Sequence, residues 1–178
     1  MSKELCGMKY PTKNDYLGIA KYTLLEFFEC IKNTLADKER ECPERFQGGG
    51  LLNMKPSTKM TILQFICSQK SKEDIASLYE WFIIDMKVMT ESGTEVAVES
   101  YLTQREEQFI LKDIFKLMPA AKEADIALFS EIWRGIDSYG NPTKLVALTE
   151  EEKMYAWTYF DIMSKFIHKH RESQLLVQ

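Results

Sequence analysis

Apolar residues recur every three or four positions through most of this chain, and this spacing limits the fold more than any other feature of the sequence. Residues three and four apart lie on the same side of an α-helix, so the pattern is typical of helices that bury one face. The first such segment runs from Asn14 to about Ala36, and its apolar stripe consists of Ala20, Leu24, Phe27, Ile31 and Leu35.

Capping signals and prolines divide the pattern into separate helices. Ser71 followed by Asp74 resembles a capping box, and Thr149 followed by Glu152 matches the full motif. Pro43 prevents the first helix from continuing smoothly into the next one. We therefore predict helices over residues 14–36, 57–69, 71–93, 104–118 and about 126–136, and from 149 to at least 167.

The second and third predicted helices define where the core should lie. The stripe of the second helix consists of Met60, Leu63 and Ile66, and we expect these side chains to pack inward. The stripe of the third helix runs from Ile75 to Met89 and ends near Ser92-Gly93.

The segment TEVAVESYLT, residues 94–103, fits two structures. Val96 and Val98 alternate as in a strand, whereas Glu95 and Glu99 would share one face of a helix. We favour the helix, which gives an all-α, single-domain bundle of six or seven helices over residues 1–178, with a Gly-rich hinge at 47–56. The alternative is an α+β fold in which residues 94–103 and 144–149 pair as a small hairpin.

Composition supports a packed, soluble protein. An apolar content of 45% and an aromatic content of 12% over 178 residues predict a substantial core. The charged start MSKELCGMKYP does not resemble a secretory signal, and the longest strongly apolar run, MTILQFICSQ, is far shorter than the roughly 20 residues that cross a bilayer. We expect a cytoplasmic protein with reduced cysteines and no membrane partner.

The stretch FQGGGLLNMKPSTKM, residues 46–60, combines three glycines with a lysine, a serine and a threonine. A Walker phosphate loop needs a glycine directly before its lysine and a strand upstream. Lys55 lacks that glycine and precedes Pro56, which has no N–H group to donate. The stretch therefore reads as a hinge, and it predicts no nucleotide cofactor.

No other pattern predicts catalysis or metal binding. His168 and His170 are separated by one residue, so on a helix they point about 200° apart and cannot hold one ion together. No aspartate has a glutamate three residues before it, and neither histidine completes an E-x-x-H motif, so the paired-carboxylate and di-iron patterns are missing. We expect no catalytic residue, no metal and no cofactor.

Charge is unevenly distributed along the chain. Residues 45–72 contain five basic residues and no acidic one, although the chain as a whole has a net charge of −4. This basic island coincides with the Gly-rich hinge and with the second predicted helix. The candidate binding residues are its five cations together with Trp81, which falls near the edge of a helix stripe: Arg45, Lys55, Lys59, Lys70, Lys72 and Trp81.

These observations favour a small non-catalytic protein that acts through protein–protein interaction. It would bind a protein partner or a second copy of itself, in a regulatory role as an inhibitor or adaptor of a basic or nucleic-acid-handling partner. One alternative is direct nucleic-acid binding through the basic segment 45–72. The second alternative is a helical enzyme whose site has no recognisable motif.

Overall fold

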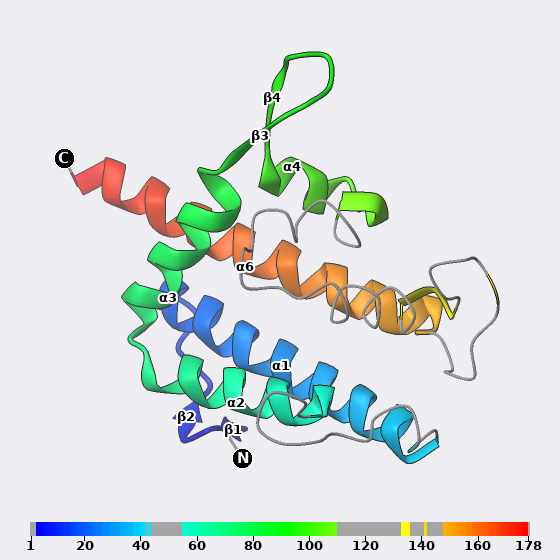
Figure 1. Ribbon diagram of the computed structural model, residues 1–178. Coiled ribbons are helices and arrows are strands. Elements are labelled where there is room, and N and C mark those ends of the chain that lie inside the picture. Colours follow the sequence, from blue (N-terminus) through cyan, green and yellow to red (C-terminus); the bar gives the residue numbers. More distant parts are fainter. Residues whose placement is uncertain are drawn as a thin grey trace.

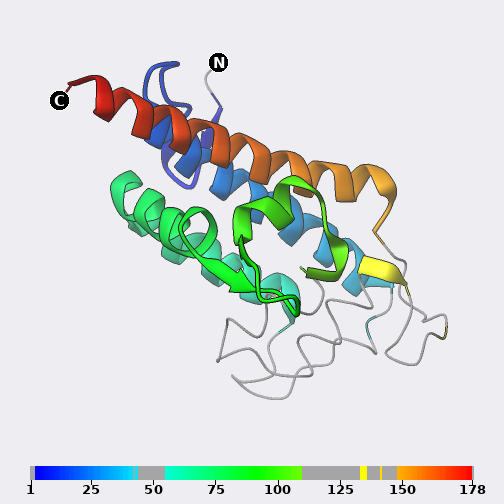
Figure 2. The ribbon, with the colours of Figure 1, turned by 90° about the horizontal axis from the view of Figure 1, so that it is seen from above.

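The computed structural model describes residues 3–41, 43, 55–109, 133–135, 141 and 148–177. These residues are mostly helical and include five α-helices, one π-helix and two short antiparallel hairpins. The long helix α1 (Tyr16–Glu41) lies between α2 (Pro56–Gln69) and α6 (Glu150–Val177) and packs along both of them (Figure 1). Figure 2 views the same elements from above, with α6 running across the width of the bundle.

The start of α1 is held by an aspartate cap. The Asp15 carboxylate accepts a hydrogen bond from the Gly18 amide at 3.0 Å and forms an ion pair with Lys72 at 2.9 Å. Burial alone would raise the pKa of Asp15, but the hydrogen bonds from Lys72 and Gly18 outweigh it and lower that pKa. The carboxylate therefore stays charged at the positive end of the helix, where a negative charge is favourable.

The two capping signals predicted from the sequence, at Ser71 and at Thr149, are confirmed. Ser71 accepts a hydrogen bond from the Asp74 amide at 3.0 Å and starts α3 (Lys72–Tyr79). Thr149 and Glu152 exchange hydrogen bonds of 3.0 and 3.1 Å between their side chains and amides, and α6 follows. This reciprocal pair is the capping box that the sequence predicts.

The predicted third helix is too long at its end. After α3 the chain passes into a π-helix, η3 (Glu80–Ile84), and then into strand β3 (Lys87–Met89), which pairs with β4 (Glu95–Ala97). The helical stripe up to Met89 is therefore wrong, and the exposed Met89 lies in a strand. The turn TESG, residues 90–93, joins β3 to β4, and Gly93 in it has φ +82°, a conformation that glycine adopts easily.

Residues 94–103 adopt both of the structures that their pattern allows. Strand β4 ends at Ala97, and α4 (Val98–Thr103) follows directly. Strand β4 pairs with β3. Most of the alternative hairpin partner, 144–149, lies outside the described residues. A second hairpin, which the sequence analysis did not predict, joins β1 (Glu4–Leu5) to β2 (Met8–Lys9) through Cys6 and Gly7, both with positive φ.

Two clusters of buried residues lie in the core of the described part of the chain. One cluster joins α1, α3 and α6 through Leu17, Ala20, Ala76 and Ile167. The other packs α4 against the first half of α6, and Trp157 contacts Trp133 with ring centroids 5.7 Å apart. Both clusters use helix stripes, as expected for a bundle.

Several predictions lie outside the described residues. Most of the helices predicted over 104–118 and 126–136 fall there, so the total of six or seven helices stays a prediction, as does the hinge at 47–56. Within the described part, Gln104 does not begin a helix: it follows α4, and Arg105 has φ +57°. Among the described residues, no helix is long and apolar enough to cross a membrane.

Candidate functional site

Helix α2 buries a polar side chain and exposes apolar ones. Gln64 is only 4% exposed, and its amide nitrogen donates to the Leu25 carbonyl at 3.0 Å and to Glu29 Oε2 at 2.8 Å. On the outward side, Phe65 is 64% exposed, and three aliphatic side chains are at least 40% exposed: Ile62, Leu63 and Ile66. We call these four apolar residues the α2 face. They are as apolar as core residues, but they lie on the surface.

The predicted inward stripe of α2 was therefore wrong for Leu63 and Ile66. The orientation of α2 is fixed at its start by Glu39 of α1, whose carboxylate accepts hydrogen bonds from the Ser57 amide at 2.8 Å and the Ser57 hydroxyl at 2.5 Å. Glu39 is 7% exposed, so its charge needs these partners. Because Ser57 and Gln64 both meet carboxylates of α1, the opposite side of α2 turns outward.

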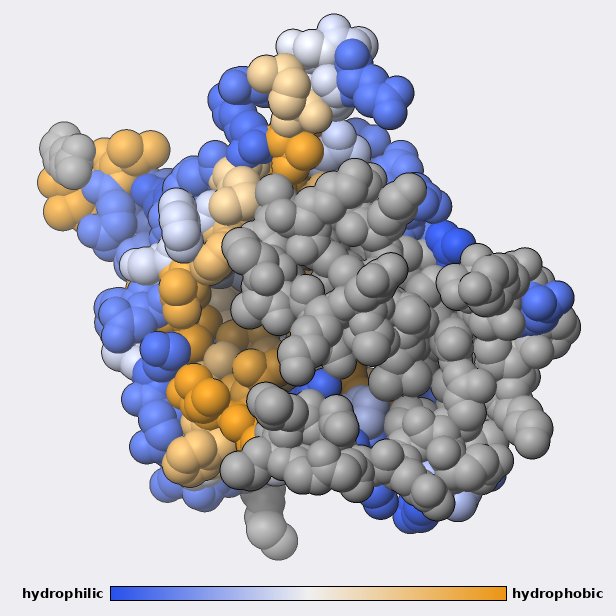
Figure 3. All heavy atoms as spheres, in the orientation of Figure 1, coloured by the Kyte–Doolittle hydropathy of each residue, from blue (hydrophilic) through white to orange (hydrophobic). Residues whose placement is uncertain are grey.

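Two aromatic rings continue the apolar surface on η3. Trp81 is 61% exposed and Phe82 39%, and their ring centroids are 4.5 Å apart. Arg171 of α6 anchors this segment through ion pairs to Glu80 and Asp85, each at 2.7 Å. Figure 3 shows apolar side chains gathered over α2 and over α3–η3 on one face of the molecule. π-Helical turns are uncommon and occur often at functional sites.

Three of the predicted binding residues lie along α2 or at its ends. Lys55 is exposed directly before α2, Lys59 is half-buried in its first turn, and Lys70 is exposed at its end. Lys72 differs from these three lysines because its side chain forms an ion pair with Asp15. Trp81 lies on η3 as described above, and Arg45 falls outside the described residues.

The apolar residues of the α2 face were not among the predicted site residues. They looked like core because their spacing is that of a buried stripe. The available signal was the opposite side of the same helix, where Ser57, Gln64 and Ser68 recur at seven- and four-residue intervals. The sequence of a helix with one polar and one apolar side does not by itself determine which side packs against the rest of the protein.

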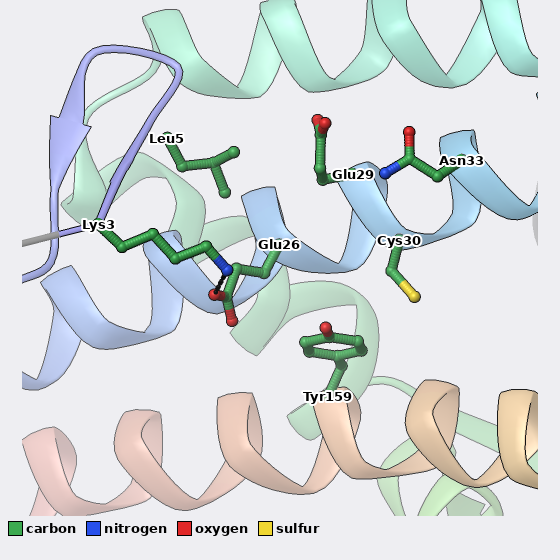
Figure 4. A pocket seen from close by; sticks show the side chains of 7 residues that line it. All are labelled: Lys3, Leu5, Glu26, Glu29, Cys30, Asn33 and Tyr159. Atoms are coloured by element: carbon green, nitrogen blue, oxygen red, sulfur yellow. Dashed lines mark hydrogen bonds and ion pairs between the residues drawn. The ribbon is translucent and has the colours of Figure 1, made fainter.

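A pocket of about 210 Å³ lies elsewhere, between the N-terminal hairpin, α1 and α6 (Figure 4). Its wall includes an ion pair between Lys3 and Glu26 at 3.1 Å. The other lining side chains are Leu5, Glu29, Cys30, Asn33 and Tyr159.

The thiol and the phenol of this pocket both favour their protonated forms. Burial raises the pKa of the Cys30 thiol, and the carboxylates of Glu152 and Glu26 raise it further. Burial likewise raises the pKa of Tyr159 to about 12. A thiol nucleophile needs a lowered pKa, so Cys30 is not activated as a nucleophile.

His168 contacts a carboxylate of another helix. His168 Nε2 lies 2.9 Å from both carboxylate oxygens of Glu99, which links α6 to α4. Over the described residues, His, Cys, Asp and Glu form no group of three that could hold a metal ion.

Comparisons with family models, curated proteins and solved structures find no match to this chain.

Proposed function

We propose that this chain is a non-catalytic binding protein that acts through protein–protein contact, and that the α2 face together with η3 is its binding surface. One observation carries the proposal: α2 buries Gln64 and leaves Phe65 64% exposed. Covering a large apolar side chain is worth about 1.5–3 kcal/mol, so a partner that covers this face gains binding energy. A protein of this kind serves as an inhibitor or adaptor of its partner.

The aromatic residues of η3 supply anchors for such a contact. Trp81 and Phe82 lie exposed beside each other. Tryptophan is among the residues that contribute most to protein interfaces, because its large ring buries much area with little loss of conformational freedom. The ion pairs of Arg171 hold the segment in place before binding.

A protein partner suits this face better than nucleic acid. Lys55 and Lys59 precede Ile62 and Ile66 along the chain, and Lys70 follows them. Contacts to phosphates would gain nothing from covering these aliphatic side chains. The adjoining first turn of α3 exposes Glu73 and Asp74, which would repel a phosphate backbone.

Affinity purification with two matched double variants tests the proposal. Phe65→Gln with Ile66→Gln changes the α2 face, and Leu176→Gln with Val177→Gln changes exposed apolar side chains at the end of α6. Because all four side chains are exposed, both variants should melt close to the parent. We expect a protein that co-purifies with the parent and the control, identified by mass spectrometry, to be lost with the α2-face variant. Recovery of the same proteins in equal amounts with both variants would overturn the proposal.

A further inference from the structure

The hairpin of β3 and β4 has one face packed on the protein and the other in solvent. Val88 packs against the buried cluster that includes Trp157. Side chains alternate along a strand, so Lys87 and Met89 point the other way, and Met89 is 61% exposed. Figure 1 shows the hairpin projecting from the body of the molecule, where another strand could reach its edges.

The outer edge of β3 carries backbone groups without partners. The Thr90 amide donates to the Thr94 carbonyl at 2.9 Å, and alternate residues along β3 make the bonds of this ladder. Lys87 and Met89 are the residues between them, so their N–H and C=O groups point away from β4. No backbone group of the described residues pairs with these outward groups. They are free to bond to a further strand.

Residues 87–91, with the sequence KVMTE, are complementary to an antiparallel copy of themselves. When Met89 lies opposite Met89 of a second copy, each Lys87 lies opposite a Glu91, and opposite charges across strands attract. Val88 then lies opposite Thr90, and both are β-branched residues that suit a strand. Lys87 and Glu91 are exposed, and within the described part of the chain neither forms an ion pair.

The outer edge of β4 lacks this complementarity. Its outward residues are Glu95 and Ala97, and β4 contains no cation to meet the carboxylate of a second copy. A lysine on an edge strand ordinarily opposes pairing with other strands, because its charge would be left without a partner. On β3 the glutamate of a second copy supplies that partner. The edge of β3 therefore suits a copy of this chain better than an unrelated strand.

We infer that β3 pairs with β3 of a second copy of this chain, antiparallel and in the register centred on Met89. The two Met89 residues exchange a pair of N–H···O=C hydrogen bonds, and the two hairpins form one four-stranded sheet. The tip of each hairpin lies beside the base of the other, so the bodies of the two copies lie at opposite ends of this sheet. The same surface is used by both copies, which gives a closed dimer with two-fold symmetry.

This contact uses a different surface from the α2 face, so it does not rest on the proposed function. It would still affect binding, because the π-helix η3 precedes β3 in every copy. A dimer presents two copies of the proposed binding surface. A partner with two equivalent sites would then bind more tightly than it binds a monomer, since the second contact forms within one complex.

Charge reversal, followed by sedimentation velocity, tests the register. Concentrations from about 5 µM to about 1 mM cover the weak affinities of so small a contact. We expect the mass of the parent to rise towards that of a dimer. Lys87→Glu or Glu91→Lys alone should weaken dimerisation at least about fivefold, because like charges then lie opposite each other. The double variant Lys87→Glu with Glu91→Lys exchanges the charges and should dimerise like the parent.

A matched control makes the same change on the other hairpin. Lys9 is an exposed lysine of β2, and Lys9→Glu should dimerise like the parent. Lys87, Glu91 and Lys9 are all exposed, so these variants should keep the fold, which circular dichroism verifies.

Disulfide cross-linking provides a second measurement that does not depend on charge. In the inferred register the Cα atoms of the two Met89 residues lie about 5.5 Å apart, a distance that a disulfide spans. Those of the two Lys87 residues lie roughly 14 Å apart, which is too far. Under mild oxidation Met89→Cys should therefore link two copies, and Lys87→Cys should not. Mass spectrometry of the linked peptides distinguishes this bond from bonds of the native cysteines.

Any of four results would overturn the inference. The parent could stay monomeric up to about 1 mM, or the charge-exchanged double variant could associate no better than the single reversals. Lys87→Cys could cross-link as fast as Met89→Cys. The parent could also dimerise with an affinity that neither reversal changes, which would place the contact on another surface. None of these results affects the proposed function, which is tested separately by co-purification with the α2-face variant.

Discussion

Replacing Gly18 by alanine should lower the stability of this protein, although alanine is the better helix former. Gly18 is buried in the first turn of α1, and its amide donates to the Asp15 cap. A Cβ atom at Gly18 would lie 2.6 Å from Cγ of Asp15, so the carboxylate would have to move away from both Gly18 and Lys72.

The balance can be estimated from three contributions. Alanine in place of glycine within a helix gains about 0.8–1 kcal/mol. Loss of an aspartate cap costs about 1 kcal/mol. The partly exposed pair between Asp15 and Lys72 adds roughly 0.5 kcal/mol. Gly18→Ala should therefore cost about 0.5–0.7 kcal/mol net, which lowers the melting temperature by roughly 1–3 °C for a chain of this size.

Without the aspartate side chain, the sign of the effect should reverse. In an Asp15→Ala background no carboxylate opposes the new methyl group, so Gly18→Ala should raise the melting temperature. The assay is thermal unfolding of all four members of this cycle, followed by circular dichroism at pH 7. An effect of Gly18→Ala with the same sign and size in both backgrounds would refute the argument, because it would mean that the cap does not depend on the space beside Gly18.

Two further predictions concern carboxylates of α1. Glu39→Ala should lower the melting temperature by roughly 4–8 °C, because a buried carboxylate that caps α2 at Ser57 is worth about 2 kcal/mol. The control Asp37→Ala, an exposed change two residues away, should cost no more than about 0.5 kcal/mol. Equal losses of stability in the two variants would contradict the capping role of Glu39. Hydrogen bonds from Lys32 and Gln64 lower the pKa of Glu29, so its contribution to stability is present above its ordinary pKa and is lost as the pH falls through its lowered pKa. Thermal melts from pH 6 to pH 3 should accordingly show the advantage of the parent over Glu29→Gln shrinking as the pH falls, and an advantage that grows would be inconsistent with this sign.

The sequence by itself determined the local signals of this protein. The start of α6 follows from Thr149 and Glu152, and the start of α3 follows from Ser71 and Asp74. These motifs satisfy backbone groups within one turn, so they act the same way whatever surrounds them. The spacing of apolar residues likewise identified α1 and α2 as helices.

Local ambiguity explains the errors around residues 86–103. The stripe through Met86 and Met89 has the helical period, but the turn before Gly93 allows the chain to return on itself, and Lys87–Met89 then pairs with Glu95–Ala97. A strand ladder depends on a partner that a single segment does not contain. The same holds for the hairpin at Glu4–Lys9.

Only the tertiary structure decided which side of α2 faces the protein. Apolar periodicity would bury Leu63 and Ile66, yet Gln64 lies inward because Glu29 and Leu25 of α1 accept its hydrogen bonds, while Glu39 fixes the start of the helix at Ser57. The basic island was visible in the sequence, but the apolar residues that it encloses were read as core. The physical reason is that helical periodicity records that two sides of a helix differ, whereas the neighbouring helix, through its own buried carboxylates, determines which of the two it contacts.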